Sequence, residues 1–113
     1  MADACLFCRI VQGEIPVARV AESDACIAFR DIGPQAPTHV LVIPRRHVES
    51  LNQLDDDAVV SEMVSMARRV AREEGIDGPG YRLVINTNAH GGQTVFHLHL
   101  HVLGGRPMRW PPG

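Results

Sequence analysis

The feature that most constrains the fold is a run near the C-terminus in which histidine alternates with apolar side chains, Phe96–Leu103. Side chains of a β-strand point alternately to its two faces. A strand over this run places three histidines in a row on one face, ~6.5–7 Å from neighbour to neighbour. These are His97, His99 and His101. The apolar residues between them then face a hydrophobic core on the other side: Phe96, Leu98, Leu100 and Val102.

The histidine row by itself is compatible with three roles. It can be catalytic, because imidazole acts as a nucleophile, an acid and a base near neutral pH. It can bind zinc, because histidine is the commonest metal ligand. It can be a solvated strand face, although that role is less consistent with three of the six histidines falling within five residues.

A glycine-rich loop, Asn88–Thr94, leads directly into the histidine row. Glycine allows successive backbone N–H groups to approach and enclose an anion. A phosphate bound there would lie beside the first histidine. Gly91-Gly92 alone is equally typical of a turn between strands. The position of the loop, directly before the histidine row, is what favours phosphate binding.

The remaining periodicity predicts two helices. A short helix covers Leu6–Val11, with Asp3 as its N-cap. A long helix starts after Asp55–Asp57, where negative charge suits the helix dipole, and ends at Gly75. Apolar residues at spacings of four, three and four give this helix one buried stripe: Val59, Met63, Met66 and Val70.

Five short runs are typical of β-strands: Ala18–Ala21, Cys26–Arg30, Val40–Ile43, Tyr81–Asn86 and Val95–Leu103. The uninterrupted apolar run Val40–Ile43 predicts a strand buried on both faces, in the middle of the sheet. The Pro- and Gly-rich segment Asp31–Thr38 predicts a loop. We therefore expect an α+β fold with a largely antiparallel sheet of about five strands, one long helix and one short helix.

Composition excludes several classes of protein. The 113 residues suit one domain over 1–113, ending in a tail from about residue 104 to 113. A net charge of −2 gives no basic field for nucleic acid. No apolar run is long enough to cross a membrane. Three cysteines and an N-terminus without the features of a signal peptide predict a cytoplasmic protein.

The run His97–Leu103 resembles the signature of the histidine triad (HIT) family, in which three histidines alternate with apolar residues. The resemblance covers almost the whole chain, through four further segments: Asp31–His39, Val42–His47, Gly80–Asn86 and Trp110–Gly113. It points to the histidine triad nucleotide-binding (Hint) branch, for which the Trp-Pro-Pro-Gly ending is the most specific piece.

This resemblance implies a HIT-like fold, a homodimer and a hydrolase. The implied reaction cleaves the P–N bond of purine nucleoside phosphoramidates and aminoacyl-adenylates through a covalent nucleotidyl-histidine, and it releases AMP or GMP. His99 matches the family's nucleophile, with a backbone carbonyl near His97 holding its other nitrogen. The groups implied to stabilise the transition state or assist the leaving amine are His101, His39, Thr94 and the backbone of Gly92 and Gln93. Relatives usually carry Ser at the position of Thr94.

The resemblance also assigns the nucleoside. Asp31 is expected to accept both ribose hydroxyls, and Asn86 to contact the sugar or phosphate. The base pocket is expected to be lined by Phe7, Ile10, Phe29 and Ile32. Core packing explains Phe7, Ile10 and Phe29 at least as well when each is taken alone, and Asp31 also fits a turn before Gly33.

A second motif is the pair Cys5 and Cys8, which resembles a half-site for zinc. In relatives that keep this pair, the other two ligands match His47 and His97. The alternative is two reduced cysteines on a short helix. Any zinc is expected to be structural, with no cofactor required for the chemistry.

Two other functions remain open at this point. A non-catalytic nucleotide-binding or scaffold protein needs no nucleophile, which the intact histidine row argues against. A dinucleoside polyphosphate hydrolase is disfavoured by the Trp110–Gly113 ending.

Overall fold

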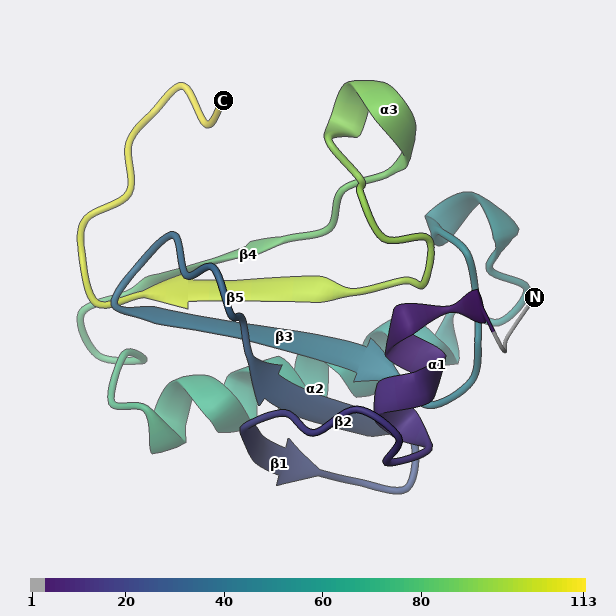
Figure 1. The fold of residues 1–113 in the computed structure, drawn as a ribbon. Helices are drawn as coiled ribbons and strands as arrows, with labels where there is room; N and C mark the ends of the chain where they lie inside the picture. The colour runs from purple at the N-terminus through teal and green to yellow at the C-terminus, as the bar shows by residue number, and fades with distance from the viewer. Residues whose placement is uncertain (1–3) are drawn as a thin grey trace.

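The computed structural model describes residues 4–113 as a sheet with helices on both faces (Figure 1). The sheet has five strands in the order β1-β2-β3-β5-β4, and every neighbouring pair is antiparallel. The strands are β1 (Arg19–Glu22), β2 (Cys26–Arg30), β3 (Thr38–Pro44), β4 (Tyr81–Val84) and β5 (Leu100–Gly104). The helices are α1 (Leu6–Val11), α2 (Ala58–Glu73) and α3 (Asn88–Gly91), with a 3₁₀ turn at Leu51–Gln53. The predicted α+β class is confirmed, and α3 is an addition within the predicted loop.

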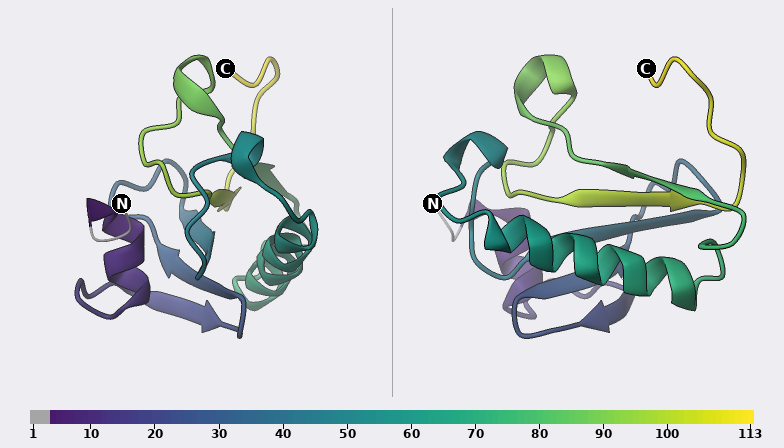
Figure 2. Two further views of the ribbon diagram at one scale, coloured as in Figure 1. Left: turned by 90° about the vertical axis from the view of Figure 1, so that its right-hand side faces the viewer. Right: turned by 180° about the vertical axis from the view of Figure 1, so that it is seen from behind.

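The short helix α1 and the long helix α2 lie on opposite faces of the sheet, as Figure 2 shows. β3 separates two apolar clusters because its residues alternate in direction. Val40 and Val42 pack with α2, whereas Leu41 and Ile43 pack with α1. All seven residues of β3 are buried, and the strand pairs with both β2 and β5. The predicted central strand is therefore confirmed.

α2 buries the predicted stripe. Met63, Met66 and Val70 are all at most 4% exposed, and Val59 packs against the same cluster. At its start the carboxylate of Asp56 accepts the N–H of Ala58 at 3.0 Å. These contacts fix α2 on the face of the sheet opposite to the one that carries the histidines.

α1 is capped by a cysteine. Asp3, the predicted N-cap, lies outside the described residues. Cys5 is the N-cap, and its Sγ accepts the N–H of Cys8 at 3.4 Å. The cap therefore brings the two cysteines of the motif together at the first turn of the helix.

The predicted strand Val95–Leu103 is wrong for its first half. β5 begins at Leu100, and Phe96 is 47% exposed instead of packing in the core. The ladder to β3 ends where Val42 pairs with Leu100, and two further steps in this register would bring the chain opposite Pro44. Proline has no N–H to donate, so the ladder stops there. The chain over residues 95–99 instead bonds outside the sheet, with Leu98 N–H donating to the carbonyl of Val48.

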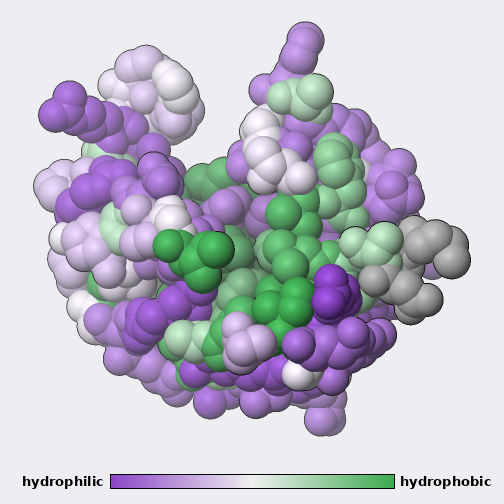
Figure 3. Space-filling model, in the orientation of Figure 1, coloured by the Kyte–Doolittle hydropathy of each residue, from purple (hydrophilic) through white to green (hydrophobic). Residues whose placement is uncertain are grey.

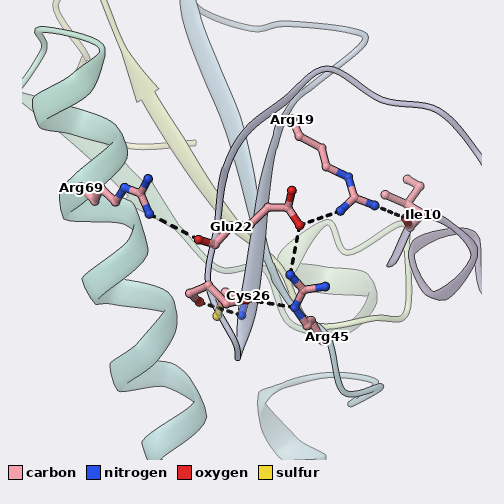
Figure 4. Close-up of polar contacts among 7 residues, drawn as sticks. Ile10, Arg19, Glu22, Cys26, Arg45 and Arg69 are labelled. Carbon is pink, nitrogen blue, oxygen red and sulfur yellow. Dashed lines mark hydrogen bonds and ion pairs between the residues drawn. The ribbon is translucent and has the colours of Figure 1, made fainter. Parts of the chain in front are cut away.

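Arginines hold the β1–β2 hairpin against both helices (Figure 4). Arg45 and Arg19 donate to Glu22 Oε1 at 3.1 and 2.9 Å, and the hydrogen bond from Arg45 is the main reason that the pKa of Glu22 lies below its usual range. Arg69 of α2 donates to the Glu22 carbonyl at 3.3 Å. Arg19 also donates to the carbonyl of Ile10, which ties the end of α1 to β1.

Within residues 4–113, no helix combines the length and the apolar character that a membrane crossing requires.

Candidate active site

Four of the functional side chains predicted from the sequence meet on the α1 face of the sheet. β5 and the segment before it supply His97, His99 and His101, and β3 supplies His39. The rings of His99 and His101 have centroids 5.1 Å apart. Phe7 of α1 lies edge-on against both His97 and His99, with centroids at 5.9 and 5.3 Å. The histidine row therefore stays on one face although two of its three members, His97 and His99, are not in a strand.

The proton position on His99 is fixed by its own backbone segment. Nδ1 lies 2.8 Å from the carbonyl oxygen of His97. A carbonyl only accepts, so the neutral imidazole carries its proton on Nδ1 and leaves a lone pair on Nε2. The ring is 94% buried, which limits its rotation. This is the arrangement that a nucleophilic nitrogen requires.

The proton position on His101 follows from a chain of two hydrogen bonds. The N–H of Gln35 donates to Nδ1 of His39 at 3.0 Å, so neutral His39 carries its proton on Nε2. That Nε2 lies 2.9 Å from Nδ1 of His101 and donates to it. Neutral His101 therefore carries its proton on Nε2.

Burial keeps these rings neutral. It lowers the pKa of His101 to about 4, with the neighbouring His99 and His39 adding to the shift. Burial likewise lowers the pKa of His39 below its usual value, against the opposing effect of Asp31. A neutral His101 offers one N–H donor beside the lone pair of His99.

Asp31 follows β2 and combines a turn role with a site role. Its Oδ1 accepts the N–H of Gly33 at 2.7 Å, and its Oδ2 lies 3.5 Å from Nε2 of His39. The side chain is 21% exposed. A carboxylate has about four lone-pair positions, so acceptor capacity remains for a ligand.

The loop before the histidines differs from the expected phosphate cradle. The N–H of Gly92 donates to the Ala89 carbonyl, and that of Gln93 to the Asn88 carbonyl, so α3 uses both backbone donors. Both amides are therefore occupied within the chain in this conformation, and their contact with a phosphate stays a prediction. Within residues 4–113, the backbone amides of Thr94 and Val95 have no recorded acceptor. The free donors lie two residues further along the chain than predicted.

Gln93 instead supports the loop from inside. Its side chain is buried, accepts the N–H of Asn88 at 2.9 Å and donates to the carbonyls of Glu49 and Val95. Thr94, next to it, is exposed. Asn86 is half-buried just after β4, and its side chain forms no recorded hydrogen bond with any residue from 4 to 113.

An apolar cavity of about 420 Å³ opens beside Asp31. All four residues predicted for the base pocket line it: Phe7, Ile10, Phe29 and Ile32. Ile32 is 99% exposed at its rim. Figure 3 shows apolar side chains gathered on the surface over α1, on the face where this cavity opens. The size and lining suit a flat, largely apolar group such as a nucleobase.

Sequence reasoning missed several cavity residues: Ile15, Val17, Leu41 and Val95. Leu41 looked like an ordinary core residue of a buried strand. Its alternation with Val40 and Val42 was the available signal, because it places Leu41 on the face that carries His39.

The structure brings together the four predicted metal ligands, Cys5, Cys8, His47 and His97, with all donor atoms within 4.8 Å of one another. Their recorded S–N and N–N separations lie between 3.2 and 3.5 Å. Tetrahedral zinc bound by two sulfurs and two nitrogens requires donor atoms roughly 3.3–3.8 Å apart. The donor set and its spacing therefore fit zinc.

His97 is also in the correct protonation state for a ligand. Its Nε2 donates to the Pro44 carbonyl at 2.8 Å, which leaves the lone pair of Nδ1 facing the cysteines. Burial lowers the pKa of His97 to about 4, so the ring is neutral at physiological pH. A metal ligand must be deprotonated at the donor atom, and this one is.

A second group of potential ligands, Asp31, His39 and His101, fits a metal less well. A metal bound at Nε2 of His39 requires that nitrogen to lose its proton. The Gln35 N–H already occupies Nδ1 and forces the proton onto Nε2. This group is therefore a proton-sharing chain.

Sequence comparison adds the family. A profile described as the HIT domain matches residues 12–108. A purine nucleoside phosphoramidase of Escherichia coli K12 is 46% identical over 96% of this chain and 92% of its own length. An uncharacterized HIT-like protein of Synechocystis is 50% identical over all of both chains.

Solved structures agree with the fold. A HIT family hydrolase of Legionella pneumophila superposes with a TM-score of 0.93 at 52% identity, covering 96% of this chain and 99% of its own. A zinc-bound histidine triad protein of Mycobacterium smegmatis has a TM-score of 0.84 at 35% identity, over 94% and 78% of the two chains. The sequence profile, the relatives and the histidine geometry agree, and the chain belongs to the HIT domain family.

Proposed function

We propose that this chain is a purine nucleoside phosphoramidase of the Hint branch, with His99 as its nucleophile. The observation that carries the proposal is the 2.8 Å hydrogen bond from His99 Nδ1 to the carbonyl of His97. It leaves an unprotonated Nε2 on a buried ring. A protein that only binds nucleotides gains nothing from such a nitrogen, and the similarity to the E. coli phosphoramidase supports an enzyme.

In the first step His99 Nε2 attacks phosphorus. A bond forms between Nε2 and phosphorus while the P–N bond to the leaving amine breaks. Negative charge on the phosphoryl oxygens is stabilised by the His101 Nε2–H and by the free backbone amides of Thr94 and Val95. The His101 donor is held in place by its hydrogen bond from His39, so little reorganisation of this ring is needed as charge develops.

The leaving nitrogen needs one proton. His101 Nε2–H and the Thr94 hydroxyl are the donors that this site offers, and His39 holds His101 in the required tautomer. In the second step water attacks the nucleotidyl-histidine, regenerates His99, restores the proton and releases AMP or GMP.

The nucleoside is bound by the apolar cavity and Asp31. The base lies between the apolar side chains of α1 and β2, and Asp31 accepts the ribose hydroxyls. Phe7 and Phe29 pack edge-to-face with centroids 5.6 Å apart, so one wall of the pocket is rigid. Asn86 stays in this proposal as a contact to the sugar or phosphate.

Zinc, when bound, is held by Cys5, Cys8, His47 and His97 and supplies a structural cross-link. It joins α1 to the segments that follow β3 and precede β5. The chemistry proceeds without it, since no zinc ligand side chain touches the reacting atoms.

We further propose that the enzyme is a cytoplasmic homodimer. The described cysteines form no disulfide, as is usual in a reducing compartment. β1 and β4 each have only one neighbour in the sheet, and pairing between copies protects such edges.

The test of the reaction class compares turnover of adenosine phosphoramidate and diadenosine polyphosphate at equal concentration. We expect kcat/KM at least about 100-fold higher for the P–N substrate, as one site tuned to one leaving group achieves. The reverse preference would identify a dinucleoside polyphosphate hydrolase. Nucleotide binding without turnover of either would identify a binding or scaffold protein.

A further inference from the structure

A second cavity, of about 380 Å³, opens beside the zinc-binding cluster. It is bounded by Cys5, His47, Glu49 and the segment Thr94–Phe96, with Ala4 and Leu6 completing the wall. Two of the four zinc ligands, Cys5 and His47, line this cavity and are half-buried. The other two, Cys8 and His97, are 5% and 0% exposed. The cluster therefore has an inner half within the protein and an outer half that opens to solvent.

Glu49 gives this cavity its charge. It is the only carboxylate among the lining residues, and no lysine or arginine joins it. Within residues 4–113 its carboxylate has no recorded ion pair or hydrogen bond. Two other glutamates, the exposed Glu22 and the half-buried Glu74, are by contrast paired with arginines.

The backbone holds Glu49 at the cavity. Its carbonyl accepts the side-chain N–H of Gln93 at 2.7 Å. On one side, the Val48 carbonyl accepts the N–H of Leu98. On the other, Ser50 is 1% exposed. The position of Glu49 is therefore set by the same segment that carries His97 and His99.

A negative charge in a concave site raises the local concentration of cations and speeds their association. Carboxylate oxygen is itself a zinc ligand. An ion entering this cavity meets Glu49 and the two solvent-facing ligands before the two buried ones. It can exchange its water molecules for protein ligands one at a time.

We propose that this cavity is the route by which zinc enters and leaves the four-residue site, and that Glu49 is the residue that captures the incoming ion. This inference rests on the proposed zinc site. An open route allows bound zinc to exchange with solution while the protein stays folded. A zinc ion sealed in the core would leave only when the chain unfolds.

The first test follows zinc transfer to and from a chromogenic chelator at low ionic strength, using wild type, Glu49→Gln and Asp77→Asn. Asp77 is an exposed acid in the turn after α2, remote from this cavity in sequence and lining, and serves as the control. We expect Glu49→Gln to slow uptake about three- to tenfold, with the difference shrinking at high salt. Release slows as well, so the equilibrium affinity changes less than either rate.

Equal rates of zinc uptake and release in all three proteins, with one zinc bound per chain, would contradict the proposed route but not the proposed zinc site. Wild-type release that is as slow as global unfolding would overturn it too. A wild-type protein that binds no zinc would remove both the site and its route without touching the phosphoramidase assignment.

The second test is independent of zinc kinetics and maps alkylation of the metal-free protein by peptide mass spectrometry. Iodoacetamide should modify Cys5 at least about tenfold faster than the buried Cys8 and Cys26, because access limits buried thiols. Bound zinc should protect Cys5. Equal rates at the three cysteines would contradict an open outer half.

Discussion

At the scale of single residues, backbone groups determine which nitrogen of each histidine carries the proton. The His97 carbonyl holds the proton of His99, and the Gln35 amide acts through His39 on His101. The His97 carbonyl and the Gln35 amide are backbone groups, which a side-chain substitution does not remove, whereas the link between them and His101 depends on the His39 ring. The site therefore has one ring with a free lone pair and, beside it, one ring with a free N–H.

The same scale explains which parts of the site the sequence predicts. Spacing of two puts the three histidines on one face, and the structure keeps them there. The tautomers of His97 and His101 could not be predicted, because they depend on the Pro44 carbonyl, 53 residues from His97, and on the His39 ring, 62 residues from His101. The free amides of Thr94 and Val95 were missed because α3 uses the amides of Gly92 and Gln93. A helix of one turn leaves no periodic signal in the sequence from which this could be predicted.

Thr94→Ser tests the space available to the leaving group. The hydroxyl stays, while loss of the methyl opens room beside the departing amine. We expect kcat/KM for a bulky amine leaving group to rise about three- to tenfold, with the unsubstituted phosphoramidate changing less than about twofold. Steady-state kinetics with a pair of such substrates measures this, and an equal effect on both would refute the steric explanation.

At the scale of elements, α1 and the segment 95–99 depend on each other. α1 and its N-cap supply two cysteines to the candidate zinc cluster, and α1 supplies the Phe7 ring that touches His97 and His99. The segment 95–99 has no ladder partner, and one backbone hydrogen bond from Leu98 to Val48 together with side-chain contacts holds it in place. Alternation in the sequence predicted a strand here. It could not show that Pro44 ends the ladder, since register depends on the partner strand.

Zinc should stabilise the protein more than it assists the reaction. We expect saturating zinc to raise the free energy of unfolding by roughly 3–4 kcal/mol, as a ligand at about 1,000 times its dissociation constant does. Cys8→Ser should abolish this gain and change kcat less than about threefold. Thermal unfolding with and without zinc measures it, with Cys26→Ala as the control that keeps the zinc response. Activity that falls in proportion to zinc removal, in a folded protein, would contradict a structural role.

Protonation of the buried histidines should destabilise the metal-free protein in acid. The pKa of His101 is about 4 in the folded state against an ordinary value near 6.5, so the unfolded chain binds more protons between these values. Stability is complete above about pH 6.5 and falls as the pH drops toward 4. Between about pH 7.5 and 5 we expect His101 alone to account for roughly 2 kcal/mol.

Denaturant unfolding of wild type, His101→Gln and His90→Gln at several pH values tests this dependence. His101→Gln should show a smaller loss of stability in acid. His90 is exposed on α3, and its variant should behave like wild type. A His101→Gln variant with the full wild-type pH dependence would show that the buried ring is not the titrating group.

At the scale of the whole molecule, the five-stranded sheet ends in strands that can pair further. Every residue of β4 is half-buried, and Trp110 in the tail is 82% exposed. A large aromatic left at the surface is typical of an interface. Both features favour an interface with a second copy of this chain. Sequence periodicity cannot predict such an interface, because it reports only on packing within one chain.

Sedimentation equilibrium should therefore give a mass near twice the 12.4 kDa of the chain. Trp110→Ala should weaken association or alter the choice of amine leaving group, because the tail lies at the proposed interface. A wild-type protein that sediments at 12.4 kDa across the accessible concentrations would contradict the dimer.

The central claim is that His99 forms a covalent bond to phosphorus, and intact-protein mass spectrometry tests it most directly. Wild type and His99→Ala are mixed with adenosine phosphoramidate, quenched rapidly in denaturant and weighed. We predict that wild type gains the mass of one adenylyl group, and that His99→Ala gains none while still binding AMP. An adduct of the same abundance on His99→Ala, or AMP release by that variant at the wild-type rate, would contradict the account.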